Sequence, residues 1–462
     1  MTDILFINHA SLLVRAGERY LLTDPWHQKP AFGSWLPTFP SFLHPAYLAA
    51  LGARLTVLIS HGHDDHCDDT MLGIFDRSTE IVTANYASPS VKNRLRKLGF
   101  ERVSTADPGG IHIANGFQVR SFINPLRSLD DATYTVDTGD GLLVHCNDNW
   151  TEFDAPARAG IGEACSRYPS EHIAFLSQTN SASGYPLNYR NFTAQQKSEI
   201  LFAKVRSMVQ QGLRNAASLG LRSFGSYAGY ASVYVHGHPE YLQQGLLPTP
   251  AFLRDSLLTD PESRALLERV SILDYLPGDV LDLSSGQVHR AFVRPGGMDD
   301  RDIKDAAERY YRHYGVINEC DSFRGRPEAV FDARKLDYFL ENLNRFAVRK
   351  CAGDGAAFGT VMGKSFEIVV EDLDVRRRVV FGQGVGAAAA ADAPPNKRMY
   401  VRSGLLSQVL DGRILFENLY TGYEAEWERH PTDVYNRDIV MFIVMYSYVY
   451  KNALSAQYGA AS

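Results

Sequence analysis

One short segment of the chain carries three imidazoles and two carboxylates, and it constrains the fold more than any other feature. It reads Ser-His-Gly-His-Asp-Asp-His over residues 60–66 and follows directly on Leu55–Ile59, a run that is apolar apart from one threonine and has the composition of a buried strand. Burying so many polar groups costs free energy unless each of them finds a partner. We therefore expect these side chains to converge on a common ligand at the end of a strand.

The spacing within this segment predicts two metal sites. His61 and His63 are two residues apart, so in extended geometry their side chains face the same side and can chelate one ion. Asp65 and His66 follow in the turn and can reach a second ion. Imidazole and carboxylate ligands together suit zinc, iron or manganese. The alternative, an exposed polar loop without metal, is disfavoured by the density of the motif and by its position after a buried strand.

Length and composition indicate a globular chain with more than one structural unit. Its 462 residues exceed the size of one typical core. A net charge of −6 gives no reason to expect nucleic acid or an anionic membrane as a partner. The longest apolar run, residues 439–446, is too short to span a bilayer, and the N-terminus does not read as a secretory signal. Five cysteines without a CxxC pair fit reduced thiols, so we expect a cytoplasmic protein.

The pattern of elements changes along the chain. Over the first 150 residues, β-rich runs alternate with turn signals such as Asn115-Gly116, which predicts consecutive hairpins. Helical spacing appears later, first in a segment opened by a capping-box pair, Thr193 and Gln196. We place a soft boundary near residue 250. Residues 1–250 are expected to form the metal domain, and residues 251–462 a C-terminal α/β extension that covers the active site and shapes substrate binding.

The HxHxDH pattern after a strand resembles the metal signature of the metallo-β-lactamase superfamily. The resemblance implies an α+β fold, an αββα sandwich, in which the remaining metal ligands come from later strand ends. It places the bridging carboxylate on an Asp that closes a downstream strand, and Asp148 fits because it follows the apolar run Leu142–His145. Asn147 beside it is a poorer candidate, because a neutral amide is a weak ligand.

The third ligand of the first metal departs from the superfamily pattern, in which a histidine stands a little before that Asp. Residues 123–134 contain no histidine, and Asp131 or Asp130 is what remains. A carboxylate there makes the site harder and favours iron or manganese over zinc. The alternative is that this Asp pair only forms a turn. The resemblance also implies a histidine further downstream as the last ligand, and His236 and His238 are the candidates.

A closer resemblance extends over most of the chain. The sequence is similar to the family of CMP-N-acetylneuraminate hydroxylases and their bacterial relatives in these stretches: residues 9–10, 22–26, 30–32, 60–66, 183–186, 228–230, 238–239, 277–283 and 412–423. This similarity favours His238 over His236 and Asp131 over Asp130. The family hydroxylase carries a Rieske iron–sulfur domain, which needs Cys-x-His and Cys-x-x-His pairs, and this chain has neither. Electrons must then come from a separate protein or from the substrate.

The residues and the resemblance together predict a metal-dependent oxidoreductase. We expect a non-haem diiron monooxygenase that hydroxylates a small organic substrate with O₂ and with electrons from a separate protein. The expected metal ligands are His61, His63, Asp65, His66, Asp131, Asp148 and His238. Three further side chains are expected to support these ligands: His9, Asp24 and His145. The rival hypothesis is a dizinc or dimanganese hydrolase of a lactone, amide or phosphoester, in which the metals activate a bridging water.

Overall fold

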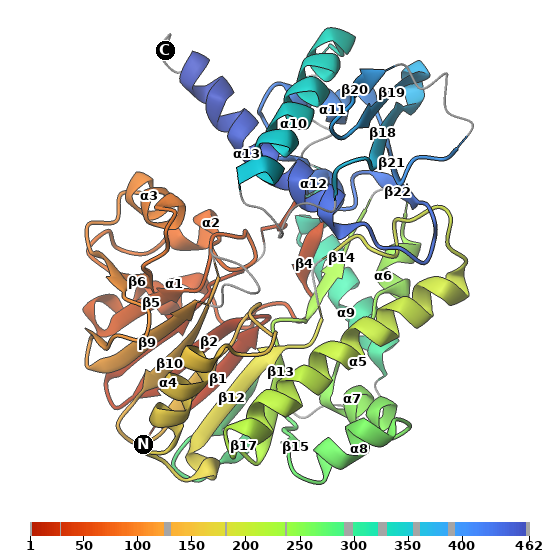
Figure 1. The fold of residues 1–462 in the computed structure, drawn as a ribbon. Helices are drawn as coiled ribbons and strands as arrows, with labels where there is room; N and C mark the ends of the chain where they lie inside the picture. Colours follow the sequence, from red (N-terminus) through yellow and green to blue (C-terminus); the bar gives the residue numbers. More distant parts are fainter. Residues whose placement is uncertain are drawn as a thin grey trace.

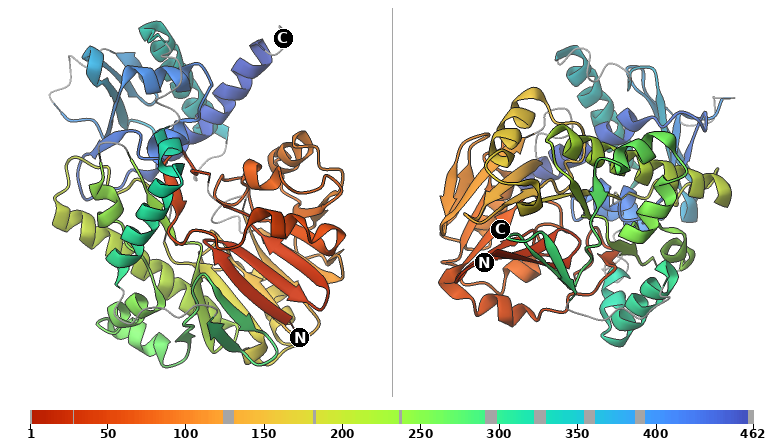
Figure 2. Two further views of the ribbon diagram at one scale, coloured as in Figure 1. Left: turned by 180° about the vertical axis from the view of Figure 1, so that it is seen from behind. Right: turned by 90° about the horizontal axis from the view of Figure 1, so that it is seen from below.

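The chain folds into two units, which can be followed in the computed structural model of Figure 1. The structure describes residues 2–27, 29–123, 131–180, 183–235, 238–290, 299–321, 330–353, 361–386 and 393–458. The first unit is a sandwich of two sheets, and the second is a single sheet flanked by helices. Figure 2 shows that the N-terminus lies at the free end of the sandwich and that the C-terminal helix ends on the opposite side of the molecule.

The first sheet combines an antiparallel half with a parallel half. In order across the sheet, its described strands are β17 (Gln287–Arg290), β16 (Asp279–Asp282), β1 (Thr2–Asn8), β2 (Ser11–Ala16), β3 (Arg19–Thr23), β5 (Leu55–Ile59), β6 (Glu80–Ala84) and β7 (Val103–Ala106). Pairing is antiparallel from β17 to β3 and parallel from β3 to β7. Every residue of β5 is buried, as its apolar composition requires for an interior parallel strand.

The second sheet has the same mixed character. Its described strands, in order, are β15 (Ser271–Ile272), β13 (Ser223–Tyr227), β12 (Ile173–Gln178), β11 (Leu142–His145), β10 (Ala132–Asp137), β9 (Phe117–Ile123) and β8 (His112–Ala114). The predicted hairpin at Asn115-Gly116 is confirmed, because Ala114 pairs with Phe117 across it. Strands β11, β12 and β13 run parallel, so their carboxyl ends reach the same edge of the sheet.

Helices cover the outer faces of the two sheets and complete an αββα sandwich. The long helix α5 (Ala194–Ser218) contacts β12 and β13, α4 (Ala155–Cys165) contacts β10 and β11, and α3 (Ser90–Lys97) contacts β7. The capping box at the start of α5 is confirmed. Apolar side chains such as Phe6 and Val119 fill the space between the sheets. The predicted α+β sandwich of metallo-β-lactamase type is therefore confirmed.

Shorter elements complete the first unit and its junction with the second. In chain order they are α1 (Pro45–Ala49), α2 (Asp69–Leu72), α6 (Glu240–Gln244), α7 (Pro250–Leu257), α8 (Pro261–Leu267) and α9 (Asp300–His313). A separate two-stranded sheet pairs β4 (Trp35–Pro37) with β14 (Ala231–Val233). The Tyr311 hydroxyl of α9 donates a hydrogen bond to the Pro37 carbonyl, which ties this helix to the small sheet.

The C-terminal unit has its own sheet and core. Its described strands, in order, are β20 (Gly384–Gly386), β19 (Val375–Val380), β18 (Ser365–Val370), β21 (Lys397–Val401) and β22 (Glu426–Arg429). The helices of this unit are α10 (Ala333–Gly353), α11 (Ser403–Leu410), α12 (Phe416–Tyr420) and α13 (Arg437–Tyr458). Buried aromatic residues, among them Phe339, Trp427 and Phe442, fill its core.

The structure corrects the boundary placed near residue 250. Strand β15 extends the second sheet, and β16 and β17 extend the first, so the sandwich continues to residue 290. Strand β16 pairs directly with β1, joining Leu281 to Ile4. Sequence periodicity could not reveal this, because a strand carries no mark of the distant strand with which it pairs. Within the described residues, no helix combines the length and the apolar character that a membrane crossing requires.

Candidate metal centre

The loop after β5 brings the histidine-rich segment to one end of the sandwich. After His61 the backbone turns, and the amides of His66 and Cys67 both donate to the His63 carbonyl. The turn folds the imidazoles of His61 and His66 against each other, with ring centres 4.1 Å apart. His61 Nε2 lies 2.9 Å from His63 Nδ1. The segment thus converges on one point, although neither described group of donors with metal-binding spacing includes His63.

Asp148 joins this segment from the opposite sheet. It follows β11, and its Oδ1 lies 3.5 Å from His66 Nε2 while its Oδ2 lies 4.0 Å from His61 Nε2. One ligand atom from each of these three residues lies within 4.8 Å of the others, a spacing that a single cation can hold. Gln178 at the end of β12 donates to Asp148 Oδ1 at 2.8 Å and keeps the carboxylate in place. Sequence reasoning missed this glutamine, because a single amide at a strand end carries no signal.

A second group of donors includes His9, which the sequence suggested only as a supporting residue. His9 Nε2 lies 3.4 Å from Asp65 Oδ2, and His66 Nε2 lies 3.8 Å from the same oxygen. These three residues form the other described group with metal-binding spacing. His9 lies in the turn between β1 and β2, more than 50 positions before the motif, so no sequence spacing linked it to the donors. His66 belongs to both groups and lies between them.

Asp131 also lies at the cluster, at its edge. Its Oδ1 is 3.8 Å from His61 Nδ1, and 8% of its side chain is exposed. The structure therefore brings this carboxylate beside the imidazole that the sequence assigned to the first metal. The competing candidate, Asp130, lies outside the described residues.

His238 is placed elsewhere. Its ring stacks on Tyr241 at 5.0 Å, and its Nδ1 lies 3.0 Å from Glu240 Oε1. Among the described residues, neither donor group includes it. The binding of the second metal by His238 stays a prediction, whereas His9 belongs to one of the two donor groups. The alternative candidate, His236, lies outside the described residues.

The cluster contains buried polar atoms that fit a metal ion. His9 Nε2, Asp65 Oδ1 and His66 Nε2 are buried and make no hydrogen bond. Leaving such atoms without partners costs free energy, and the cost is removed when they coordinate a cation. All three are nitrogen or oxygen donors of the kind that zinc, iron and manganese accept. The residues present therefore fit a metal centre.

The buried carboxylate of Asp24 orients the donor residues through hydrogen bonds. It accepts hydrogen bonds from the Ser60 amide and hydroxyl, both at 2.7 Å, from His66 Nδ1 at 3.0 Å and from His145 Nε2 at 3.1 Å. An ionised carboxylate accepts only, so we assign the His66 proton to Nδ1, which leaves Nε2 free for a metal. The Tyr227 hydroxyl is 2.8 Å from His145 Nδ1 and extends the network.

The charges of the cluster stabilise one another. Burial raises the pKa of Asp24, but His66 and His145 outweigh burial and hold it below its usual range. In the metal-free protein, Asp65 and Asp148 outweigh burial and raise the pKa of His66, and the charge that His66 then carries lowers the pKa of Asp148 to about 2 although burial raises it. The pKa of His61 is lowered, first by burial and then by its histidine neighbours. These shifts keep the carboxylates ionised and His61 neutral, and those are the protonation states in which the side chains bind cations.

The backbone around the donors adopts a conformation that few residue types tolerate. His9, Asp24 and Asn147 have positive φ angles of 38°, 39° and 41°. His, Asp and Asn are among the non-glycine residues found most often in this left-handed region. Each stands at a turn that aims a donor or its support into the cluster. Such outliers gather at functional sites, where the surrounding structure maintains them.

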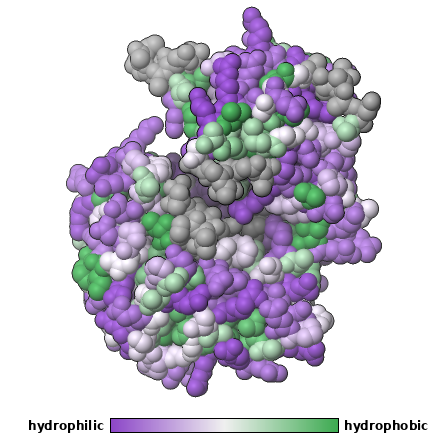
Figure 3. Space-filling model, viewed as in Figure 1, coloured by the Kyte–Doolittle hydropathy of each residue, from purple (hydrophilic) through white to green (hydrophobic). Residues whose placement is uncertain are grey.

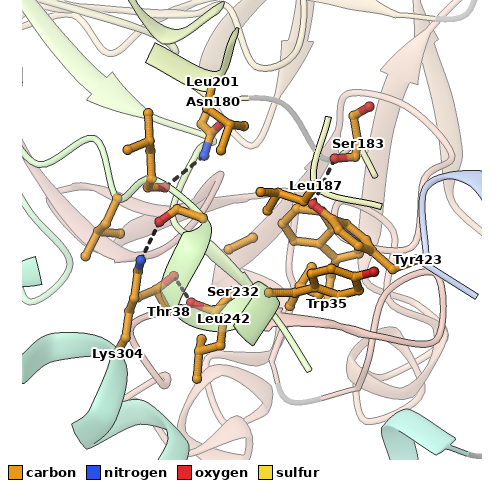
Figure 4. A pocket seen from close by; sticks show the side chains of 16 residues that line it. Trp35, Thr38, Asn180, Ser183, Leu187, Leu201, Ser232, Leu242, Lys304 and Tyr423 are labelled. Carbon is orange, nitrogen blue, oxygen red and sulfur yellow. Dashed lines mark hydrogen bonds between the residues drawn. The ribbon is translucent and has the colours of Figure 1, made fainter. Parts of the chain in front are cut away.

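A separate pocket is lined by other residues. It lies between the small β4–β14 sheet, α6 and the C-terminal unit, and Trp35, Tyr423 and Lys304 line it (Figure 4). Several of its polar groups bond within the protein: Thr38 with Ser232 at 2.8 Å, and the Tyr423 hydroxyl with the Ser183 carbonyl at 3.1 Å. None of its lining residues belongs to the two donor groups.

The comparisons with known proteins agree with a metal centre on this fold. No protein-family profile matches the chain. A protein of Mycobacterium tuberculosis named as a Rieske 2Fe-2S iron–sulfur protein is 31% identical over 191 residues, which are 40% of this chain and 36% of that protein. The cytidine monophosphate-N-acetylneuraminic acid hydroxylase of Asterias rubens is 22% identical over 340 residues, 69% of this chain and 47% of the hydroxylase.

A third relative carries a hydrolase name. A UPF0173 metal-dependent hydrolase of Rhizobium meliloti is 26% identical over 156 residues, 32% of this chain and 60% of that protein. The chain thus spans between 36% and 60% of the length of these three relatives. Both a hydroxylase and a hydrolase are therefore among the proteins to which this chain is similar.

Two solved structures are similar to part of this chain at low TM-scores. CmlA, a diiron β-hydroxylase from Streptomyces venezuelae, has a TM-score of 0.39 and 15% identity, covering 63% of this chain and 54% of CmlA. Igni18, a metallo hydrolase from Ignicoccus hospitalis, has a TM-score of 0.37 and 15% identity, covering 60% of this chain and 97% of Igni18. The assignment of the fold rests on the two facing sheets and on the position of the motif after β5.

Proposed function

We propose that this chain is a dinuclear metal-dependent oxygenase that hydroxylates a small organic substrate. The observation that carries the proposal is the carboxylate content of the donor cluster: Asp65, Asp131 and Asp148 all face the imidazoles of His61 or His66. Hard oxygen donors beside imidazole favour iron or manganese over zinc. Iron in both positions is the metal content that we favour.

The residues of the chain have defined parts in this proposal. When bound, a pair of irons supplies the redox chemistry by which O₂ is reduced and a substrate bond is oxidised. Asp24 keeps a proton on His66 Nδ1 and so directs Nε2 towards the donor cluster. Gln178 holds Asp148 in the donor group that it forms with His61 and His66. The burial of His9, Asp65 and His66 excludes bulk water from that side of the centre.

The Asterias rubens relative supports an oxygenase, because it is a hydroxylase by name and its match covers 69% of this chain. Hydroxylation with O₂ consumes two electrons from a donor. The sequence contains no Cys-x-His or Cys-x-x-His pair with which to bind a Rieske cluster. A separate electron-donor protein is therefore part of the proposal.

A dizinc or dimanganese hydrolase is the second candidate. The Rhizobium meliloti relative, a metal-dependent hydrolase by name, favours it. The same donors could hold two cations that lower the pKa of a bridging water and polarise the oxygen of a lactone, amide or phosphoester. This reading requires neither O₂ nor an electron donor.

Metal analysis separates the two candidates. The full chain is expressed with iron, zinc and manganese all supplied, and its metal content is measured after purification. We expect close to two irons per chain, together with a change in visible absorbance when O₂ meets the reduced protein. Two zincs per chain, with cleavage of a lactone or ester in the absence of O₂, would instead establish the hydrolase.

A further inference from the structure

His63 differs from the other histidines of the motif because it faces the C-terminal unit. Its side chain is 41% exposed, whereas that of His61 is 5% exposed. Its Nδ1 is directed at His61 Nε2, the atom that also faces Asp148. Its Nε2 points away from the cluster, and Glu417 Oε1 of α12 lies 3.6 Å from it. Each nitrogen of this ring thus faces a different unit of the protein.

Glu417 is held in place by its own unit. It lies in α12, and its other oxygen, Oε2, accepts a hydrogen bond of 2.8 Å from the Tyr448 hydroxyl of α13. Its side chain is 15% exposed. Among the described residues, Glu417 alone has a carboxylate oxygen within 4.0 Å of His63 Nε2. Figure 1 shows α12 on the side of the C-terminal unit that faces the sandwich.

We propose that Glu417 is a positioning residue for the metal centre, an inference that rests on the dinuclear centre proposed above. A neutral imidazole has one protonated nitrogen and one lone pair. A carboxylate next to Nε2 favours the tautomer that carries its proton there, and this leaves the lone pair of Nδ1 for a cation shared with His61. Glu417 thereby does for His63 what Asp24 does for His66.

The distance of 3.6 Å between His63 Nε2 and Glu417 Oε1 is longer than a hydrogen bond. Because the His63 ring is partly exposed, it can move and shorten this distance. A half-exposed ring that contacts Phe32 edge-on at 5.5 Å can rotate by a small amount without disturbing the core. Binding of a cation at Nδ1 makes the Nε2–H a stronger donor and draws it towards the carboxylate. The C-terminal unit therefore completes the metal centre rather than only covering it.

The test measures binding of Co²⁺, which reports its ligands through its visible spectrum. The full-length wild type, Glu417→Ala, Glu417→Gln and Tyr448→Phe are titrated in competition with a chelator. We expect Glu417→Ala to weaken binding of the cation at His61 and His63 by about 10- to 100-fold and to alter its visible spectrum. Glu417→Gln is expected to have a smaller effect, because the amide oxygen can still accept a hydrogen bond from the Nε2–H, and Tyr448→Phe the smallest.

Two matched variants serve as controls. Tyr450→Phe removes a hydroxyl from the same helix that bonds the Leu410 carbonyl, away from the centre. Glu371→Gln removes a carboxylate of the same unit that pairs with Arg190. Both are expected to bind Co²⁺ with the affinity and spectrum of the wild type. A Glu417-specific change is then a property of the contact with His63.

The inference is overturned if folded Glu417→Ala binds both cations with unchanged affinity and spectrum. If that variant does not fold, Glu417→Gln and Tyr448→Phe decide, since both keep the size of the side chain, and wild-type binding in both rejects the inference. If the wild type binds two cations and the variants do not differ from it, only the role of Glu417 fails. If the wild type binds no pair of cations, the proposed function fails with it.

Discussion

Two buried carboxylates, Asp24 in the sandwich and Glu367 in the C-terminal unit, are compensated in different ways. Asp24 is fully buried and accepts from two histidines and one serine. The side chain of Glu367 is 2% exposed and is paired with the guanidinium groups of Arg378 and Arg398. Both carboxylates are partnered, yet only one of them belongs to a cluster with unsatisfied donors.

The difference lies in whether the partner of each carboxylate has a second nitrogen that can bind a metal ion. Arg378 and Arg398 are permanent cations without a lone pair, so neither of them can bind a metal ion, and Arg398 pairs with a second carboxylate, Glu428. Each histidine bonded to Asp24 has a second nitrogen, and for His66 that atom faces Asp65 and Asp148. The buried carboxylate that is paired with arginines thus belongs to the structural core. The one that is bonded to histidines orients a ring nitrogen for metal binding. Figure 3 shows that the surface is indented between the two units.

The largest expected effect follows from removing the histidine that Asp24 holds. His66 belongs to both donor groups, so His66→Ala is expected to abolish tight binding of both cations, whereas His61→Ala removes one donor group only. The metal content of each variant after dialysis tests this. His172→Ala, outside the described donor groups, should keep the wild-type content. Retention of both metals by His66→Ala would contradict the shared position of this residue.

A pair of matched substitutions tests the comparison directly. Asp24→Asn keeps the shape of the side chain but removes its charge, so we expect metal affinity to fall by about 10- to 100-fold. Glu367→Gln removes the carboxylate that Arg378 and Arg398 share, although Arg398 still pairs with Glu428, and it is expected to lower the free energy of unfolding by about 3 kcal/mol, with unchanged metal affinity. Chelator competition and urea unfolding measure the two quantities. The comparison fails if Glu367→Gln weakens metal binding as much as Asp24→Asn does.

The smallest effect concerns pH and the metal-free protein. The pKa of Asp148 is about 2 in the folded chain, below the ordinary value of 3.8, because His66 outweighs the effect of burial. A lowered folded-state pKa contributes stability that is complete above the unfolded-state value and is lost as the pH falls towards about 2. The contribution is about 2 kcal/mol, and Asp148→Asn should remove it.

Urea unfolding of the metal-free protein at about pH 5 and about pH 3 measures this contribution. Asp64→Asn is the matched control, because Asp64 pairs with Arg94 and not with a histidine. We expect the control to keep the acid-dependent loss of stability and Asp148→Asn to show less of it. Equal losses in both variants would show that Asp148 is not coupled to His66.

The sequence by itself determined the local part of this site. The donors between His61 and His66 are close in the chain, so a strand end and one turn are enough to bring them together, and the prediction did not depend on the rest of the fold. The hairpin at Asn115-Gly116 and the capping box of α5 were local signals of the same kind, whereas the layered sandwich came from the resemblance to a known superfamily. Asp148 came from the resemblance to a known superfamily, and the structure places it against His61 and His66.

The tertiary structure decided what distant residues contribute. It placed His9 among the donors and His238 beside Tyr241, and it brought Glu417 to His63 across the boundary between the units. It also put β16 next to β1, well past the expected boundary. Local propensity and spacing reach over a few turns of chain, whereas the pairing of distant strands and the docking of one core on another depend on surfaces that exist only after folding.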